Sequence, residues 1–183
     1  MKVLIDTNIL ISAVLFPRSK PAKALLFASE HCDMVLCDRN IFELRDVLER
    51  KAPNALPDAE VLLAELSYEL IPAAYHVEKL IRDAKDQPIL NAAIVADVDI
   101  ILTGDKDFLS LEMEHPRCMT AAQFLEEEDF FVLVRNPLNT EHFMHNFIRH
   151  LDRADQNQHI ENQFRDIAPD HADRRGVGID FRR

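Results

Sequence analysis

The sequence predicts an α/β protein, a sandwich in which helices cover both faces of a parallel sheet. Two observations carry this prediction. Short apolar runs recur along the first two thirds of the chain, as in strands that are buried on both faces. Longer segments with helical apolar spacing separate these runs, and this alternation is typical of β-α units wound into a parallel sheet.

The first part of the chain is expected to supply two strands and three helices. The strands are predicted at residues 2–5 and 34–37, and the helices at 7–16, 21–31 and 39–51. Pro17 ends the first helix, whereas Pro21 opens the second, because proline is tolerated in the first helical turn. Asp38 is placed to cap the third helix.

The second part is expected to continue the alternation. Helices are predicted at 57–69, 86–96 and 120–128, and strands at 70–73, 99–102 and 117–119. Thr120 and Gln123 have the spacing of a capping box, which opens the last of these helices. Together these elements predict an N-terminal domain over residues 1–130.

Residues 131–183 have a different composition. An amphipathic helix is predicted over 137–151, with one apolar stripe made of Phe143, Met144, Phe147, Ile148 and Leu151. The polar tail that follows is rich in Asp, Arg, Asn and Gln, and such composition indicates flexibility. The stripe predicts packing against the chain's own domain or a second copy in a homodimer, or else against a different protein.

Composition excludes several classes of protein. The net charge of −11 argues against attraction of nucleic acid by the protein body as a whole. Three scattered glycines cannot form the phosphate-binding loops of nucleotide-binding proteins. The three cysteines fit no zinc spacing. No apolar run is long enough to cross a membrane, and we expect a cytoplasmic protein with core thiols.

Acidic residues follow the predicted strands at two places. Asp6 comes directly after the first strand, and Asp105 follows the fourth strand after a two-residue turn, with Asp107 on the same turn. Ligands of wound parallel sheets bind outside the carboxyl ends of the strands. Asp86 begins the helix before the fourth strand, and Glu43 lies in the helix after the second. If the first and fourth strands are neighbours, these acids converge.

Convergence of acids has a cost that a cation removes. Two unit charges about 4 Å apart repel by roughly 4 kcal/mol at an effective dielectric of 20. Mg²⁺ or Mn²⁺ relieves this repulsion because hard divalent cations prefer carboxylate oxygens and water. Attack of metal-activated water on a phosphodiester is the chemistry that suits such a site. The metal can then attract the phosphate that the acidic body repels.

Each acid also has a purely structural interpretation. Asp6 and Asp105 can cap the helices that follow them. Asp86 can interact favourably with the positive end of the dipole of the helix that it begins. Glu43 can pair on its helix with Arg39 or Arg50.

Polar and basic residues near these acids complete the candidate site. Asn8 is placed to orient Asp6, or else bonds its own backbone, and Thr103 offers a supporting hydroxyl at the end of its strand. The basic candidates for contact with substrate phosphates are Lys20, Arg45 and Lys106, with Arg18 and Lys23 nearby.

Four segments together resemble the PIN-domain family. They are D-T-N-I-L-I-S-A at 6–13, a glutamate in the helix after the second strand, K-D-Q-P-I-L-N-A-A at 85–93 and L-T-G-D-K-D-F at 102–108. The likeness covers about residues 1–128. It implies a three-layer α/β/α fold with a five-stranded parallel sheet in the order 3-2-1-4-5, which makes the first and fourth strands adjacent.

The resemblance also implies roles for single residues. Asp6, Glu43, Asp86 and Asp105 match the family's acidic quartet, with Glu49 the alternative to Glu43. Asp107 matches an additional acid, so the metal ligands implied are Asp6, Asp86, Asp105 and Asp107. Asn8 and Thr103 match the supporting polar residues.

We therefore expect a metal-dependent endoribonuclease that uses Mg²⁺ or Mn²⁺. Members of the family include toxins of bacterial type II toxin–antitoxin systems, so an antitoxin protein is the partner implied. One alternative is a PIN-like module that binds RNA or protein without cutting. Another is phosphoryl transfer to Asp6, although Asn8 stands where a phosphatase motif of that kind has a second aspartate.

Overall fold

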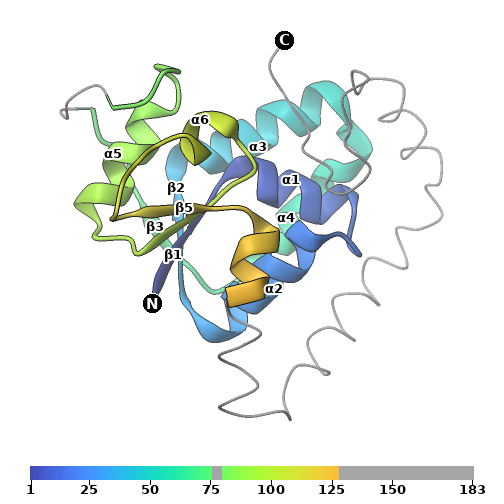
Figure 1. Cartoon of the computed structure of the whole chain (residues 1–183). Coiled ribbons are helices and arrows are strands. Elements are labelled where there is room, and N and C mark those ends of the chain that lie inside the picture. Colours follow the sequence, from blue (N-terminus) through green and yellow to red (C-terminus); the bar gives the residue numbers. More distant parts are fainter. Residues whose placement is uncertain (76–79, 128–183) are drawn as a thin grey trace.

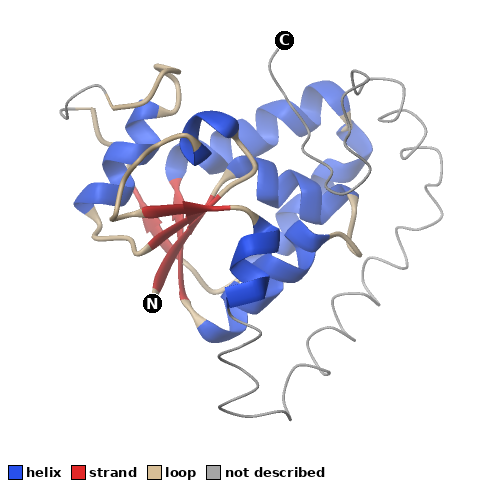
Figure 2. Ribbon diagram, viewed as in Figure 1, coloured by secondary structure: helices blue, strands red, loops and turns tan. Residues whose placement is uncertain are grey.

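The computed structural model describes residues 1–75 and 80–127. Figure 1 shows the path of the chain, and Figure 2 shows helices on both sides of the sheet. The elements follow in the order β1 (Lys2–Ile5), α1 (Thr7–Leu15), α2 (Lys20–His31), β2 (Asp33–Cys37), α3 (Asp38–Lys51), η1 (Pro53–Ala55), α4 (Leu56–Glu65), β3 (Glu69–Ile71), α5 (Gln87–Val95), β4 (Ile100–Leu102), α6 (Lys106–Leu109) and β5 (Arg117–Met119). A further helix covers 121–127.

The five strands form one parallel sheet in the order β3-β2-β1-β4-β5. This confirms the predicted fold class and strand order. Ile5 pairs with Leu102 at the carboxyl ends of β1 and β4. The backbone N–H of Asp6 extends the pairing by donating to the Leu102 carbonyl at 3.0 Å. Asp6 and the residues after Leu102 therefore leave the sheet side by side.

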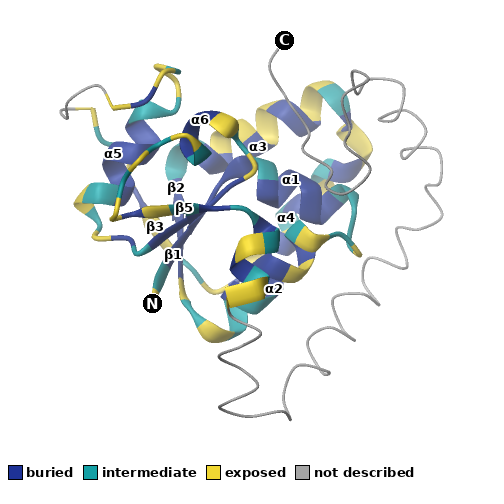
Figure 3. Ribbon diagram, viewed as in Figure 1, coloured by how far each residue is buried: buried dark blue, intermediate teal, exposed yellow. Residues whose placement is uncertain are grey.

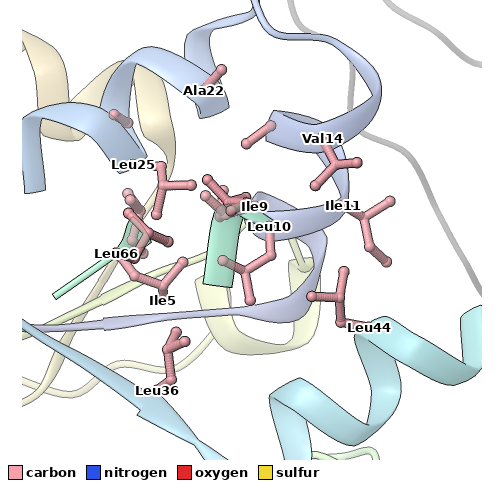
Figure 4. Close-up of a cluster of buried hydrophobic side chains, with 14 of the residues drawn as sticks. Ile5, Ile9, Leu10, Ile11, Val14, Ala22, Leu25, Leu36, Leu44 and Leu66 are labelled. Carbon is pink, nitrogen blue, oxygen red and sulfur yellow. The ribbon is translucent and has the colours of Figure 1, made fainter. Parts of the chain in front are cut away.

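Alternate residues of each strand pack into two separate cores. Val3 and Ile5 of β1 face the core under α1, α2, α3 and α4, part of which Figure 4 shows. Leu4 faces the opposite core, which α5 and Phe108 of α6 cover. The central strands β1, β2 and β4 are largely buried, and Figure 3 shows that the inner helix faces are buried too. Burial on both faces explains why the strands read as continuous apolar runs.

Several predicted boundaries differ from the observed ones, most by one residue, and the predicted cap of the third helix was wrong. The helix predicted at 57–69 ends at Glu65, because Leu66 adopts an extended conformation and Glu69 opens β3. The third helix begins at Asp38, and Cys37 occupies the cap position. The carboxylate of Asp38 instead accepts the backbone N–H of Ala73, at 2.9 Å, just after β3. The short elements η1 and α6 were not predicted.

The capping box before the last helix is confirmed. Thr120 Oγ1 accepts the N–H of Gln123 at 3.2 Å, and Gln123 Oε1 accepts the N–H of Thr120 at 2.9 Å. The helix predicted over 137–151, with its apolar stripe, lies outside the described residues. Within the described ranges, no helix combines the length and apolar character that a membrane span requires.

Candidate active site

Asp6 is the centre of a buried hydrogen-bond network at the end of β1. Its Oδ1 accepts the N–H of Thr7 at 2.7 Å, so it does cap α1 as one interpretation held. Its Oδ2 accepts the Thr103 hydroxyl and the Asn8 amide, both at 2.5 Å. The residue is only 5% exposed. The Asp6 carboxylate therefore caps α1 through one oxygen and binds Thr103 and Asn8 through the other.

The pKa of Asp6 is raised to about 7. Burial is the main cause, since it disfavours the charged form, and the negative charges of Glu43 and Asp105 raise the pKa further. The hydrogen bonds from Thr103 and Thr7 act in the opposite direction. Two of the other predicted acids, which come from distant parts of the chain, therefore lie close enough to Asp6 to raise its pKa.

Asn8 ties the two strand ends together. Its amide nitrogen contacts Asp6 and also Thr103 Oγ1, the latter at 3.3 Å, and its Oδ1 accepts the N–H of Gly104 at 2.9 Å. A Cβ at Gly104 would stand 3.4 Å from that Oδ1, in van der Waals contact with Asn8. Thr103 Oγ1 also accepts the N–H of Asp105 at 2.9 Å. These bonds fix the turn after β4 against Asp6.

Glu43 points from α3 toward the start of α1. Its Oε2 accepts the Thr7 hydroxyl at 2.7 Å. The buried Asn40 holds the same hydroxyl, with its amide nitrogen 3.1 Å from Thr7 Oγ1. Pairing of Glu43 with Arg50, one alternative from the sequence, is not found, because Arg50 pairs with Asp46. The structure thus turns Glu43 toward the residue that follows Asp6.

Asp86 precedes α5 without capping it. Its side chain accepts no capping hydrogen bond, although it occupies the cap position. Its pKa is raised to about 7, first by burial and then by the charges of Asp6, Asp105, Asp83 and Glu43. The four acids of the predicted quartet therefore lie close enough to act on one another. Asp83 is an additional acid that the sequence analysis missed.

Asp105 caps the short helix α6. Its Oδ1 accepts the N–H of Asp107 at 2.7 Å. Asp107 is buried, and both of its carboxylate oxygens face the Arg82 guanidinium, at 2.8 Å from Nη2 and 3.3 Å from Nε. Arg82 comes from the segment between β3 and α5 and was not identified from the sequence. No short motif links it to Asp107, which lies 25 residues further along the chain.

The three predicted basic residues are placed differently. Lys106 is exposed in the first turn of α6, between Asp105 and Asp107. Lys20 is exposed at the start of α2. The Arg45 guanidinium forms two hydrogen bonds with the Glu60 carboxylate of α4, at 2.6 and 2.8 Å. Of the three, Lys106 is the one next to the acids in sequence.

The chemistry of the acidic cluster fits a hard divalent cation. Within residues 1–75 and 80–127, no three His, Cys, Asp or Glu side chains are gathered tightly enough to hold a metal on their own. Mg²⁺ does not require this, because it keeps several waters and often takes one or two carboxylates. Asp6 and Asp86 repel each other and Asp105, and a doubly positive ion relieves that repulsion.

Comparisons with known proteins agree with the fold. A sequence model described as PIN domain matches residues 2–107. An uncharacterized protein of Methanocaldococcus jannaschii is 29% identical over 147 residues, covering 72% of this chain and 94% of the relative. The solved structure of VapBC2 from Rickettsia felis, bound to a DNA fragment from their promoter, matches with a TM-score of 0.54 and 16% identity. That match covers 66% of this chain and 98% of the other, and it shows the shared fold.

Proposed function

The chain belongs to the PIN-domain family, and on that premise we propose that it is a metal-dependent endoribonuclease. Proteins of this family are generally nucleases. One observation carries the proposal: acids from four separate segments raise the pKa of Asp6 and Asp86. A protein that used these acids only as helix caps would not need to bring them together.

The residues of the proposed site have three different roles: binding the metal, orienting Asp6 and positioning water. Asp6, Asp86 and Asp105 would hold Mg²⁺ or Mn²⁺. The bound ion would activate water and steady negative charge on the phosphate. Asn8 and Thr103 orient Asp6 through its Oδ2. Glu43 would position a water or the metal's hydration shell through Oε1, because Thr7 holds its other oxygen.

The burial of Asp6 argues against the phosphoryl-transfer alternative. A carboxylate that accepts a phosphoryl group must let the phosphorus of the substrate approach one of its oxygens directly, whereas Asp6 is almost completely buried. Binding a metal needs only one lone pair: Oδ2 accepts two hydrogen bonds, but Oδ1 accepts the N–H of Thr7 and keeps a second lone pair for an ion. Attack of water on a phosphodiester needs no covalent bond to Asp6 and suits the geometry better.

RNA is the proposed substrate and an antitoxin protein the proposed partner. Both follow from the family resemblance, and the fold shared with VapBC2 of Rickettsia felis supports the second. A homodimer remains a proposal that rests on the apolar stripe at 143–151. None of the three cysteines, all of which lie in the described residues, is in a disulfide, and this is compatible with the proposed activity in the reducing cytoplasm.

The proposal is tested by cleavage of a labelled RNA with and without Mg²⁺ or Mn²⁺. Asp86→Asn is the sharpest variant, because its side chain caps no helix and its loss disturbs little structure. We expect cleavage to fall about 100-fold or more, as for loss of transition-state electrostatics. Asp58→Asn, which replaces an acid in the first turn of α4, is the matched control. Equal rates for Asp86→Asn and the parent would refute the assignment.

The alternative is a PIN-like module that binds RNA or protein without cleaving it. Titration calorimetry separates the two functions. The nuclease requires Mg²⁺ or Mn²⁺ binding that weakens in Asp6→Asn and Asp86→Asn. A binding module would show no ion binding and no cleavage but would still retain RNA or a protein partner.

A further inference from the structure

Arg82 presents an exposed positive charge that a buried carboxylate holds in place. Its side chain is 78% exposed, whereas that of Asp107 is only 6% exposed. Asp107 contacts Nε and Nη2 of the guanidinium. An arginine has five N–H donors in a rigid plane, so this contact leaves several directed away from Asp107. Such a fork is suited to bind a phosphate.

The backbone on the amino side of Arg82 is fastened to α5. Gln87 Oε1 accepts the N–H of Leu80 at 2.7 Å and that of Ile81 at 3.1 Å. The Ile81 side chain is buried in the core under α5. Arg82 is therefore fixed at both ends, through its backbone neighbours and through its guanidinium. A fixed arginine loses little conformational entropy when it binds a ligand.

Arg82 lies at the border of the acidic cluster. The carbonyl of the next residue, Asp83, accepts the backbone N–H of Asp86 at 3.2 Å. The partner of Arg82, Asp107, donates its backbone N–H to Asp105. Arg82 is thus linked on one side to Asp86 and on the other to Asp105, two residues of the proposed metal site.

The Arg82 guanidinium faces the Asp107 carboxylate through both Nε and Nη2. Arg82 therefore places a positive group beside the proposed cation site, at its rim.

Building on the proposed nuclease function, we propose that Arg82 binds the RNA backbone at a phosphate next to the one that is cut. Asp107 is then a positioning residue, which aims the guanidinium, rather than a metal ligand. This revises the role that the family resemblance implies for Asp107. It also explains how a chain of net charge −11 can hold a polyanion beside its own acids.

The binding test uses an Asp86→Asn background, in which RNA stays intact. Fluorescence anisotropy measures the affinity for a labelled single-stranded RNA at several salt concentrations. Arg82→Ala should weaken binding about tenfold and reduce the slope of log affinity against log salt by about 0.7, the value for one lost phosphate contact. Arg117→Ala is the matched control, because Arg117 forms a similar two-point pair with Glu127 at the surface. It should change neither quantity.

Asp107→Asn separates positioning from metal binding. In the otherwise native chain, Asp107→Asn and Arg82→Ala should both raise KM for RNA about tenfold with little change in kcat, which is the signature of lost substrate binding. Mg²⁺ affinity, measured by calorimetry without RNA, should stay within about twofold of the parent, because the proposal makes neither side chain a ligand of the ion. Circular dichroism checks that each variant is folded.

Three outcomes overturn the proposal. If Arg82→Ala binds RNA with the parent's affinity and salt slope while the parent still cleaves RNA, this inference alone fails. A loss of Mg²⁺ affinity of tenfold or more in Asp107→Asn with unchanged KM makes Asp107 a ligand. If the parent neither binds nor cleaves RNA, the proposed function fails and takes this inference with it.

Discussion

Thr7 donates its hydroxyl hydrogen to Glu43, with 2.7 Å between Oγ1 and Oε2. This bond joins the first turn of α1 to the middle of α3, across 36 residues of sequence. Thr7 follows Asp6 directly, so the same turn that holds Asp6 also aims Glu43. The hydroxyl in turn accepts a hydrogen bond from the buried Asn40. Thr7 therefore connects Asp6 and Glu43, two acids of the proposed site, by hydrogen bonds to both.

Thr7→Val removes this connection while nearly preserving side-chain volume. We expect RNA cleavage to fall about 10- to 100-fold, as for misplacement of a catalytic group. Loss of the acceptor for Asn40 should lower the free energy of unfolding by about 1–3 kcal/mol. Thr7→Ser keeps the hydroxyl and should retain most activity. Cleavage at the parent's rate in folded Thr7→Val would show that Glu43 needs no such orientation.

Glu43→Gln and Glu49→Gln distinguish the two glutamates that the sequence left open. Both lie on α3, and both are exposed. Glu43 alone contacts Thr7 and contributes to the raised pKa values of Asp6 and Asp86. We expect Glu43→Gln to reduce kcat about 10- to 100-fold and Glu49→Gln to leave it within twofold. The reverse result would place the site on the other face of α3.

Most of the fold followed from local patterns. The strands at 2–5 and 117–119 were predicted at their observed bounds. The first is a short apolar run, which has few alternatives in a sheet covered on both faces. The strand order came from the family resemblance, since register between distant strands leaves no mark in one sequence. The end of α4 was missed because Leu66 continues the apolar spacing although its backbone is already extended.

The site was predictable where its residues follow strands and hidden where they pair across the fold. Asp6 and Asp105 stand directly at the ends of apolar runs, which is a signal that sequence reasoning can use. Arg82 contacts Asp107, and Asn40 contacts Thr7. No spacing in the sequence predicts such pairs. Asp83 lies three residues before Asp86, and that proximity to a candidate acid was the available signal.

Asn91 should stabilise the segment that carries Arg82, Asp83 and Asp86. It is buried, accepts the Gln87 amide at 2.7 Å and donates to the Ala74 carbonyl at 3.0 Å. Asn91→Leu leaves both partners without this bond, and we expect the free energy of unfolding to fall by about 1–3 kcal/mol. Urea denaturation measures this loss. Asn54→Leu, at an exposed position of η1, should change stability by less than about 0.5 kcal/mol.

The pKa of Asp6 predicts an unusual pH dependence of stability. Its ordinary value of 3.8 is raised to about 7 in the folded protein, so between these values the folded state binds more protons than the unfolded state. Stability from this group is fully present below pH 3.8 and is lost as pH rises through about 7. We expect Asp6 to contribute a loss on the order of 3 kcal/mol between pH 5 and pH 8 in the metal-free protein, and Asp86, whose pKa is raised in the same way, to add to it. Urea denaturation across this range should show a smaller loss for Asp6→Asn.

The lowered pKa of Glu60 does not disturb this test. Its hydrogen bond with Arg45 depresses the pKa below the ordinary value of 4.5, so its contribution to stability changes only under more acidic conditions. A metal-free protein whose stability stays constant or rises between pH 5 and pH 8 would contradict the burial of Asp6 beside Glu43 and Asp105.

Mg²⁺ should reverse this loss, and more strongly at high pH. At pH 8 the carboxylates of Asp6 and Asp86 are mostly charged, because their pKa values are about 7, and a divalent ion relieves their repulsion. At pH 5 protons occupy both sites and compete with the metal. Saturating Mg²⁺ should therefore raise the melting temperature by several degrees at pH 8 and by about one degree or less at pH 5.

Asp86→Asn should reduce the effect at pH 8, whereas Asp58→Asn should preserve it. An equal rise at both pH values would mean that the ion stabilises the fold elsewhere, because only a site whose ligands titrate near neutrality loses its affinity over this range.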